Sequence, residues 1–324
     1  MYKVCIFFKL IFYKIVDFLS VEVKPKVREL TEFDYLEMII ALLPLAVFGF
    51  LIFGYNAILV VLVSLAVCVG IDTLINLIIR RGKVLDYSSI VMGLLLGLCL
   101  NGNLDLIIVA SVAGLATVLR KVLFKKESDL RFTFAILLSR EIFAIIFGKA
   151  FTTYLYPFLN LKTAAPIELM LKGSLEQYSA KYYFFGLQAG NIGEISVILA
   201  LLGGIYLIFR RFINPHTPIS FILASAALSY IFKENLAVTL LGSGLVFAAF
   251  FMTMDYGFVI DNKFKKSLYG VVCAVFTFII RKIIKTDAVY FAVLITDLLV
   301  FYVNRQNIAK VVTFFKKFKK VKSE

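Results

Sequence analysis

Long apolar runs separated by short polar stretches make up the chain from residue 36 to residue 303. The runs are continuous rather than alternating, which favours helices over the strands of a membrane β-barrel. Most of them approach the length of about 17 to 25 residues that a helix needs to cross a bilayer. The pattern predicts an all-α polytopic membrane protein with about ten transmembrane helices. The predicted segments are 36–55, 57–79, 88–101, 104–123, 132–156, 190–209, 218–232, 236–254, 267–280 and 287–303.

The basic residues predict how these helices are oriented. If the amino terminus is inside, most of the 35 Lys and Arg residues fall in inner loops and tails, which is typical of cytoplasmic segments. Both termini then lie inside, and one long outer loop divides the spans into two groups of five. Groups with an odd number of spans face opposite ways, as inverted repeats do. The expected regions are an interfacial amphipathic segment 1–35, a first repeat 36–156, an extracellular or periplasmic loop 157–189, a second repeat 190–303 and a basic cytoplasmic tail 304–324.

The composition excludes several classes of protein. The chain is 61% hydrophobic, well above the roughly 50% of soluble domains, so it belongs in the lipid bilayer of the cell (inner, cytoplasmic) membrane. In that setting the net charge of +14 marks cytoplasmic loops rather than a nucleic-acid partner. The four cysteines show no Cys-x-x-Cys spacing and the single histidine lies in a loop, so no metal site is predicted. No catalytic triad, phosphate loop or dinucleotide fingerprint occurs, so no catalytic residue is assigned.

Glycine interrupts the third span of each group, at "IVMGLLLGLCLNGN" (90–103) and "LLGSGLVFAAFFM" (240–252). Paired glycine-interrupted spans at matching positions indicate a binding site near the bilayer midplane, between the repeats. Close helix packing explains the same glycines equally well.

The stretch "GNIGEIS" at the start of the sixth span is the best candidate for a cofactor site. Backbone and polar groups here suit the carbonyls of a flavin ring, with an acid as a fixed charge. A carboxylate that meets a helix N-terminus is the structural alternative. The candidate residues are Gly190, Asn191, Gly193, Glu194 and Ser196.

A second set of candidates opens the third span: Asp86, Ser88, Ser89 and Gly93. They are expected to line the same central site, although the first three also form an ordinary helix N-cap series.

Charged residues also occur inside predicted spans, among them Asp72, Arg140, Glu141 and Asp297. Intramembrane charges indicate either function or structural pairing. Arg140 and Glu141 are adjacent on one helix, so we expect them not to pair face to face.

Four stretches occur in an order that resembles the RnfD/NqrB family of membrane subunits. They are "ALLPLAVFGFLIFGYNAILVVLVS" (41–64), "LDYSSIVMGLLLGLCL" (85–100), "GNIGEISVILALLGGIYLIFRRFI" (190–213) and "VFAAFFMTMD" (246–255). The resemblance implies two inverted five-helix halves in a multisubunit complex. Such complexes pass electrons through flavins and couple this to sodium or proton movement, so the chain would be at most a subunit of an oxidoreductase.

Family members carry FMN on a threonine in the outer loop, in a motif that reads roughly Asp-x-x-Ser/Thr-Gly-Ala-Thr, often followed by Pro. Here the loop reads "LNLKTAAPIE" (159–168). With Pro166 as the anchor, Ala165 occupies the acceptor position, and it has no oxygen to esterify. Thr163 reaches that position only after a shift of two residues. The resemblance therefore implies FMN or riboflavin bound without a covalent link.

Other family features are also altered. The Asn-Pro-rich run that usually opens the fifth span is "RFTFAILLSRE" (131–141), and the Asp-Pro after the eighth span is "DYGF", with Asp255 kept. The chain is thus expected to be a divergent member.

Two functions stay open. One is an electron-transport subunit that works with other subunits of its complex. The other is a transporter or scaffold without redox chemistry that docks a flavinylated extracellular partner. The aromatic stretch "QYSAKYYFF" (177–185) fits an interfacial belt better than a flavin sandwich.

Overall fold

The computed structural model describes residues 31–78, 86–123, 132–158, 161–173, 180–254 and 262–303. The predicted interfacial segment and basic tail, as well as Leu159 and Asp255, lie wholly or mainly outside these ranges. Most of the described residues are helical.

The helices form two groups joined by a connecting segment, which we define as residues 154–189. The first group is α2 (Glu32–Phe53), α3 (Tyr55–Ile78), α4 (Tyr87–Leu98), α5 (Leu106–Leu123), α6 (Phe132–Ile146) and the short α7 (Gly148–Thr152). The connecting segment holds β1 (Tyr154–Leu155), β2 (Lys162–Thr163), α8 (Pro166–Leu171) and α9 (Ala180–Phe185). The second group is α10 (Val197–Phe209), α11 (His216–Ile231), α12 (Leu236–Leu241), α13 (Leu245–Phe247), the π-helical turn η1 (Ala248–Met252), α15 (Lys263–Ile284) and α16 (Val289–Val303).

Each predicted segment overlaps a helix, with one correction at the sixth. That helix begins at Val197 rather than Gly190, because Ser196 caps it by accepting a hydrogen bond from the Leu199 backbone N–H at 3.4 Å. By length and composition, α2, α3 and α15 are able to cross a membrane, and α4, α10, α11 and α16 are shorter apolar helices. The number of spans and the inverted repeats remain predictions.

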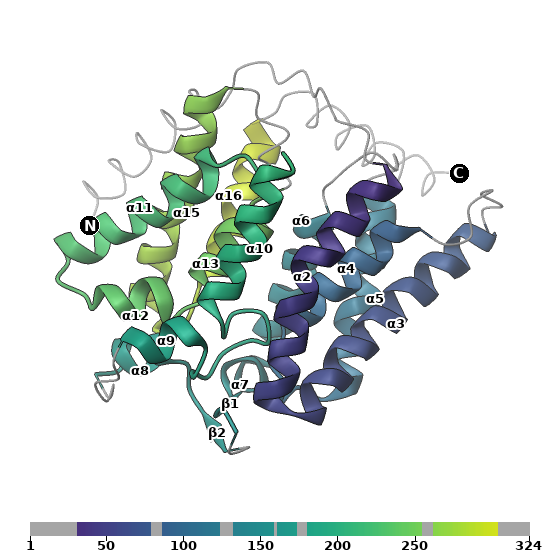
Figure 1. Ribbon diagram of the computed structural model, residues 1–324, viewed down its shortest axis with the longest axis horizontal. Helices are drawn as coiled ribbons and strands as arrows, with labels where there is room; N and C mark the ends of the chain where they lie inside the picture. Colours follow the sequence, from purple (N-terminus) through teal and green to yellow (C-terminus); the bar gives the residue numbers. More distant parts are fainter. Residues whose placement is uncertain are drawn as a thin grey trace, which may run out of the picture.

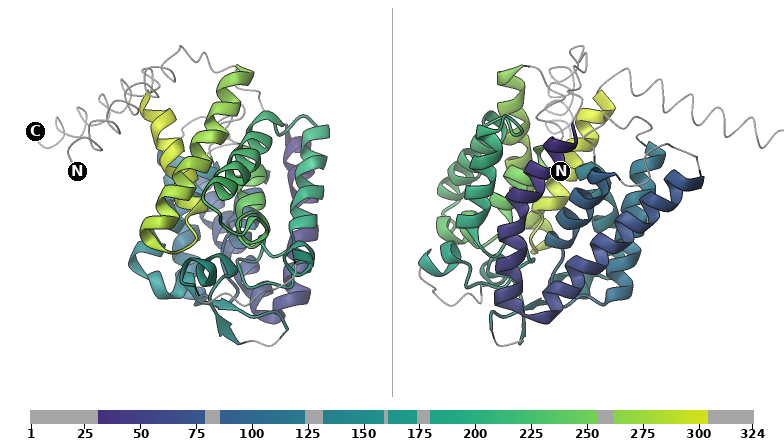
Figure 2. Two further views of the ribbon diagram at one scale, coloured as in Figure 1. Left: turned by 90° about the vertical axis from the view of Figure 1, so that its left-hand side faces the viewer. Right: turned by 45° about the vertical axis from the view of Figure 1, so that its right-hand side comes forward.

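The two groups lie side by side, with the first at the right and the second at the left of Figure 1. They touch through α2 with α10 and through α6 with α16. The connecting segment lies below both groups in this view, and Figure 2 shows it again beneath them. Its strands β1 and β2 form a two-residue antiparallel ladder, with Tyr154 opposite Thr163.

Helix α4 ends inside the bundle rather than at its surface. Leu96, Leu98, Cys99 and Leu100 are all fully buried there. A buried helix end leaves carbonyl oxygens that must find donors, because none can come from lipid. The backbone N–H of Gly193 donates to the Leu98 carbonyl at 2.8 Å, and that of Ile192 to the Leu100 carbonyl at 3.0 Å.

The carbonyl of Cys99, at the same end of α4, receives a hydrogen bond from Arg140 Nε at 3.2 Å. The loop 190–196 and α6 thus complete the end of α4. The first and second groups are joined at this point by backbone hydrogen bonds as well as by packing.

Close approach at Gly193 leaves no room for a side chain. A Cβ there would lie 2.9 Å from Leu98 Cβ and 2.9 Å from Phe247 Cε2. We expect Gly193→Ala to cost about 1–3 kcal/mol of unfolding free energy through overpacking, seen as a lower melting temperature in detergent. Gly148→Ala is the control, since a Cβ at Gly148 would meet nothing within 4 Å. Equal melting temperatures for the two variants would contradict the close approach.

Candidate functional site

Glu194 is the centre of a buried polar network formed by the loop 190–196. The residue is 7% exposed. Its carboxylate accepts from Asn191 Nδ2 at 2.9 Å and from the Asn191 backbone N–H at 3.3 Å. The loop therefore folds back on its own acid, and Asn191 supplies two donors to it.

The same carboxylate lies against the start of α13. A Cβ on Gly244 would lie 2.2 Å from Glu194 Oε1, so only glycine allows this contact. The Gly244 backbone N–H is 3.4 Å from Asp287 Oδ2, and Asp287 Oδ1 pairs with Arg281 Nη2 at 2.7 Å. Two carboxylates thus surround the N-terminal end of α13, where the helix dipole favours negative charge.

Arg140 brings α4, α6 and α16 together at this network. Its guanidinium lies over the Tyr290 ring of α16 at 4.4 Å from the centroid. It also forms an ion pair with Glu141, and both side chains are buried. The expectation that these neighbours would not pair was therefore wrong. The reason is that a desolvated carboxylate without a cation is an uncompensated buried charge, and the nearest guanidinium stabilises it most. The two long side chains therefore turn toward each other.

The structure brings together one of the two predicted sets of site residues. Gly190, Asn191, Gly193, Glu194 and Ser196 all lie in the loop around Glu194.

Three residues of the other set, Asp86, Ser88 and Ser89, lie at the opposite end of α4, about 18 Å of helix away. Asp86 caps α4 by accepting from the Ser88 backbone N–H at 3.0 Å, and Arg120 Nη2 donates to Ser88 Oγ at 2.6 Å. Ser89 Oγ donates to the Asp86 carbonyl at 2.7 Å. The structure therefore gives this set a capping role and does not bring it to Glu194.

Gly93, in the middle of α4, has a packing role. A Cβ there would lie 2.7 Å from Leu65 Cα on α3. Close helix packing accounts for this glycine.

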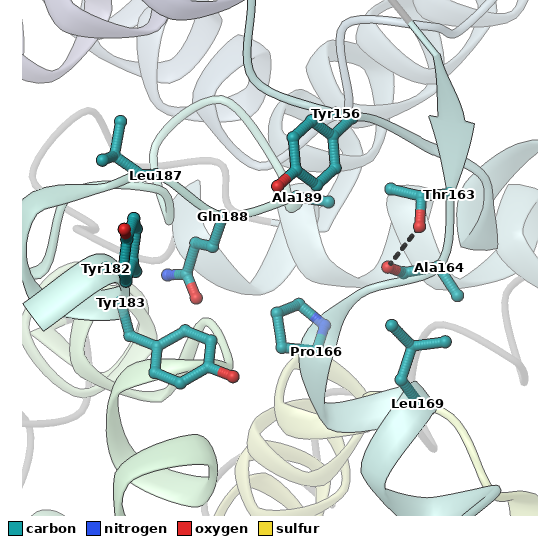
Figure 3. Close-up of a pocket in the computed structure, with 10 residues that line it drawn as sticks. All are labelled: Tyr156, Thr163, Ala164, Pro166, Leu169, Tyr182, Tyr183, Leu187, Gln188 and Ala189. Atoms are coloured by element: carbon teal, nitrogen blue, oxygen red, sulfur yellow. Dashed lines mark hydrogen bonds between the residues drawn. The ribbon is translucent and has the colours of Figure 1, made fainter. Parts of the chain in front are cut away.

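A small, partly open pocket lies in the connecting segment. Tyr182, Tyr183 and Gln188 lie on one side and Thr163, Ala164 and Leu169 on the other, with Pro166 and Tyr156 between them (Figure 3). The lining is mostly aromatic and apolar, with few polar groups. Tyr156, Thr163, Ala164, Pro166, Leu169, Tyr182, Tyr183, Leu187, Gln188 and Ala189 line it.

Within the part of the chain that the structure describes, two buried polar atoms around this pocket have no hydrogen-bond partner: the Tyr183 hydroxyl and Gln188 Oε1. Burial raises the pKa of Tyr183, so its hydroxyl stays protonated. The Gln188 amide nitrogen donates to the Leu241 carbonyl at 2.9 Å and to the Ile195 carbonyl at 3.3 Å, which holds the side chain in place. Unsatisfied groups of this kind are rare in folded proteins and suit a bound polar ligand.

Thr163 and Ala165, the two residues considered for flavin attachment, lie in different surroundings. Thr163 lines the pocket from β2, with Oγ1 at 3.4 Å from the Ala164 carbonyl. Ala165 is 5% exposed and lies just before α8, packed in a small apolar cluster with Ile167, Tyr183 and Val238. The residue that carries the only hydroxyl of this stretch, Thr163, therefore lies in the pocket wall, and its hydroxyl is directed to the Ala164 carbonyl (Figure 3).

Sequence reasoning missed several members of the two sites: Tyr156, Tyr183, Gln188, Gly244 and Asp287. The aromatic stretch 177–185 was the available signal, and it favoured an interfacial belt. Nothing in the pattern around Gln188 or Asp287 marks them, because their neighbours come from distant parts of the chain.

The fold and the central network define a multi-pass helical membrane protein with buried charge between two helix groups. Comparison with known families places the chain more narrowly. The family model described as "NQR2, RnfD, RnfE family" matches residues 21–312. The chain belongs to this family.

Individual relatives agree, and each is the D subunit of an ion-translocating complex. The chain is 30% identical over 252 residues to that of the Na(+)-translocating ferredoxin:NAD(+) oxidoreductase complex of Acetobacterium woodii, covering 75% of this chain and 78% of the relative. It is 29% identical over 237 residues to that of the proton-translocating ferredoxin:NAD(+) oxidoreductase complex of Clostridium ljungdahlii, covering 67% and 71%. It is 26% identical over 247 residues to that of the ion-translocating oxidoreductase complex of Methanosarcina acetivorans, covering 74% and 77%.

The Glu194 network makes a prediction about stability. Asn191→Ala removes the 2.9 Å donor from a buried carboxylate, so we expect it to destabilise the protein by about 1–3 kcal/mol. Thermal unfolding in detergent measures this. Asn56→Ala on the exposed face of α3 is the control and should change the melting temperature little. An unchanged melting temperature for Asn191→Ala would show that the network does not support the fold.

Proposed function

We propose that this chain is the membrane subunit of an Rnf-like or Nqr-like electron-transport complex of the cytoplasmic membrane. In this role it passes electrons across or along the membrane and couples this to sodium or proton movement. The observation that carries the proposal is the family match over residues 21–312, together with a polar-edged aromatic pocket in the segment between the helix groups. The names of the relatives point to ferredoxin and NAD(+) as the substrates of the whole complex.

The pocket fits the ring system of a flavin better than its phosphate. A planar aromatic ring needs a largely apolar slot with a few hydrogen-bonding groups at its edge. Three tyrosines and two unsatisfied polar atoms meet this need. Among the described residues that line the pocket none is basic, so the structure offers no charged partner for a phosphate.

We therefore propose that the pocket holds FMN or riboflavin without a covalent link. Tyr156 and Tyr182 would flank the ring, Gln188 Oε1 would accept a hydrogen bond from it, and the Tyr183 hydroxyl would donate one. A bound flavin supplies one- and two-electron transfer. The protein's own part is to fix Gln188 through its bonds to Leu241 and Ile195 and to keep the pocket largely apolar.

The proposed partners are the other subunits of such a complex. The Ala165 side chain favours a second candidate function, because it leaves the expected acceptor position without an oxygen. In that alternative the chain is a scaffold or transporter without its own flavin, and it docks a flavinylated extracellular protein.

We predict that native chain, purified in mild detergent, releases flavin on denaturation and shows no flavin fluorescence in a denaturing gel. Tyr183→Phe should weaken flavin retention roughly three- to tenfold, the equivalent of about 0.5–1.5 kcal/mol for one hydrogen bond. It should not lower stability, because this hydroxyl has no partner within the described protein. The measurements are flavin content by absorbance after acid release and in-gel fluorescence.

Tyr230→Phe is the matched control, since Tyr230 is 84% exposed on α11 and is not one of the residues that line the pocket. Native chain without releasable flavin would favour the scaffold. A fluorescent band that disappears in Thr163→Ala would show covalent attachment at Thr163 and contradict the non-covalent site.

A further inference from the structure

Glu168 is a buried acid in the wall of the connecting segment that neither the central network nor the pocket uses. It lies in α8, between Pro166 and Leu169, both of which line the pocket. It is 1% exposed, and its buried Oε1 atom has no hydrogen-bond partner among the described residues. A buried carboxylate with one oxygen left without a donor is costly when ionised, so this position calls for an explanation.

The charges around Glu168 do not compensate an ionised carboxylate. Lys172, one turn later on α8, is 3.9 Å from Oε2, but its side chain is 53% exposed, so solvent weakens the pair. Asp287, before α16, faces Glu168 as a like charge, and its own partner is Arg281. Burial is therefore the main factor that opposes ionisation of Glu168, and the carboxylate of Asp287 adds to it.

Among the residues that the structure describes, the other elements packed against α8 supply no further cation. Tyr154 on β1 and Tyr183 on α9 are neutral phenols in the same small apolar cluster. Helix α12, which contacts α8, reads "LAVTLL" and has no titratable side chain. Burial, followed by the charge of Asp287, raises the pKa of Glu168 to about 7, while Lys172 and the Asp287 backbone N–H lower it by less.

Helix α8 is held by few contacts. It has six residues; its buried apolar side chains are Pro166 and Ile167, and Met170 and Leu171 are only partly buried. A helix this short has little stability of its own. Its position therefore depends on the same cluster into which Glu168 is buried.

We propose that Glu168 is a proton-operated latch on α8: the neutral acid keeps α8 packed against α12 and closes one wall of the pocket, and loss of the proton releases it. The released carboxylate reaches water, and Pro166 and Leu169 move away with it. The latch acts on the pocket of the proposed function, but it operates whether or not a flavin is bound there.

The sign of the pH effect follows from proton linkage. The packed form holds a proton on Glu168 up to about pH 7, whereas a free glutamate loses it near 4.5. The packed form is therefore fully favoured below about pH 4.5. Between about pH 4.5 and about pH 7 the equilibrium constant for opening rises by up to about tenfold per pH unit, and above about pH 7 it stays constant.

Hydrogen–deuterium exchange of the α8 amides, in the full chain in detergent or nanodiscs, tests the latch. Wild-type chain and Glu168→Gln, which mimics the neutral acid, are compared at each pH, so that the intrinsic pH dependence of exchange cancels. We expect the ratio of wild-type to E168Q exchange to approach one toward pH 4.5, to rise through pH 7 and then to remain constant. The α11 amides should show a ratio near one throughout.

Glu234→Gln is the matched control. It removes an acid of the second helix group that is paired with Lys282. It should leave the pH dependence of α8 exchange as in wild type. A wild-type to E168Q ratio that does not change with pH, or an effect of E234Q equal to that of E168Q, would overturn the latch.

If E168Q disturbed the whole fold, wild-type chain alone would still decide. The protection of α8 relative to α11, corrected for intrinsic exchange, should fall between about pH 4.5 and about pH 7. A flat profile overturns the proposal. Because no flavin takes part in this measurement, its outcome is independent of whether the pocket binds one.

Discussion

The buried end of α4 is the constraint around which the rest of the protein is arranged. A helix that stops inside a membrane protein leaves carbonyl oxygens that lipid cannot satisfy. Backbone N–H groups of the loop 190–196 and the guanidinium of Arg140 satisfy them. Because these donors come from α6 and from the start of the second group, satisfying one helix end also joins the two helix groups at their centre.

The same geometry determines where buried charge collects. Arg140 lies in the interior, where it donates to the Cys99 carbonyl at the end of α4, and Glu141 is its buried ion-pair partner. The loop that caps α4 also carries Glu194, which its own Asn191 and the start of α13 hold. Acids and arginines therefore meet where broken helices end, as expected where non-helical backbone is buried in protein rather than exposed to lipid.

The apolar runs predicted the helices well because a continuous apolar segment has few alternatives in lipid. Positions within the sites were harder to predict. The loop around Glu194 could be marked as a candidate because glycine, asparagine and acid stand together in "GNIGEIS", and its role as a cofactor site stays a prediction. Asp86, Ser88 and Ser89 were assigned to the same site, yet α4 separates them from it and they cap its other end. Helix geometry argued against an Arg140–Glu141 pair, because adjacent side chains on an exposed helix point in different directions. In the buried site each charge would be uncompensated without the other, so the pair forms.

The sequence by itself determined the class of protein, the helical segments, the family and the loss of an oxygen at position 165, because these depend on composition, periodicity and residue identity along the chain. Only the tertiary structure decided that Thr163 faces a pocket, that Gln188 and Tyr183 leave polar atoms unpaired beside it, and that Glu168 is buried near Asp287. Those properties depend on desolvation and on neighbours that come from distant segments, and no local pattern in the chain records them.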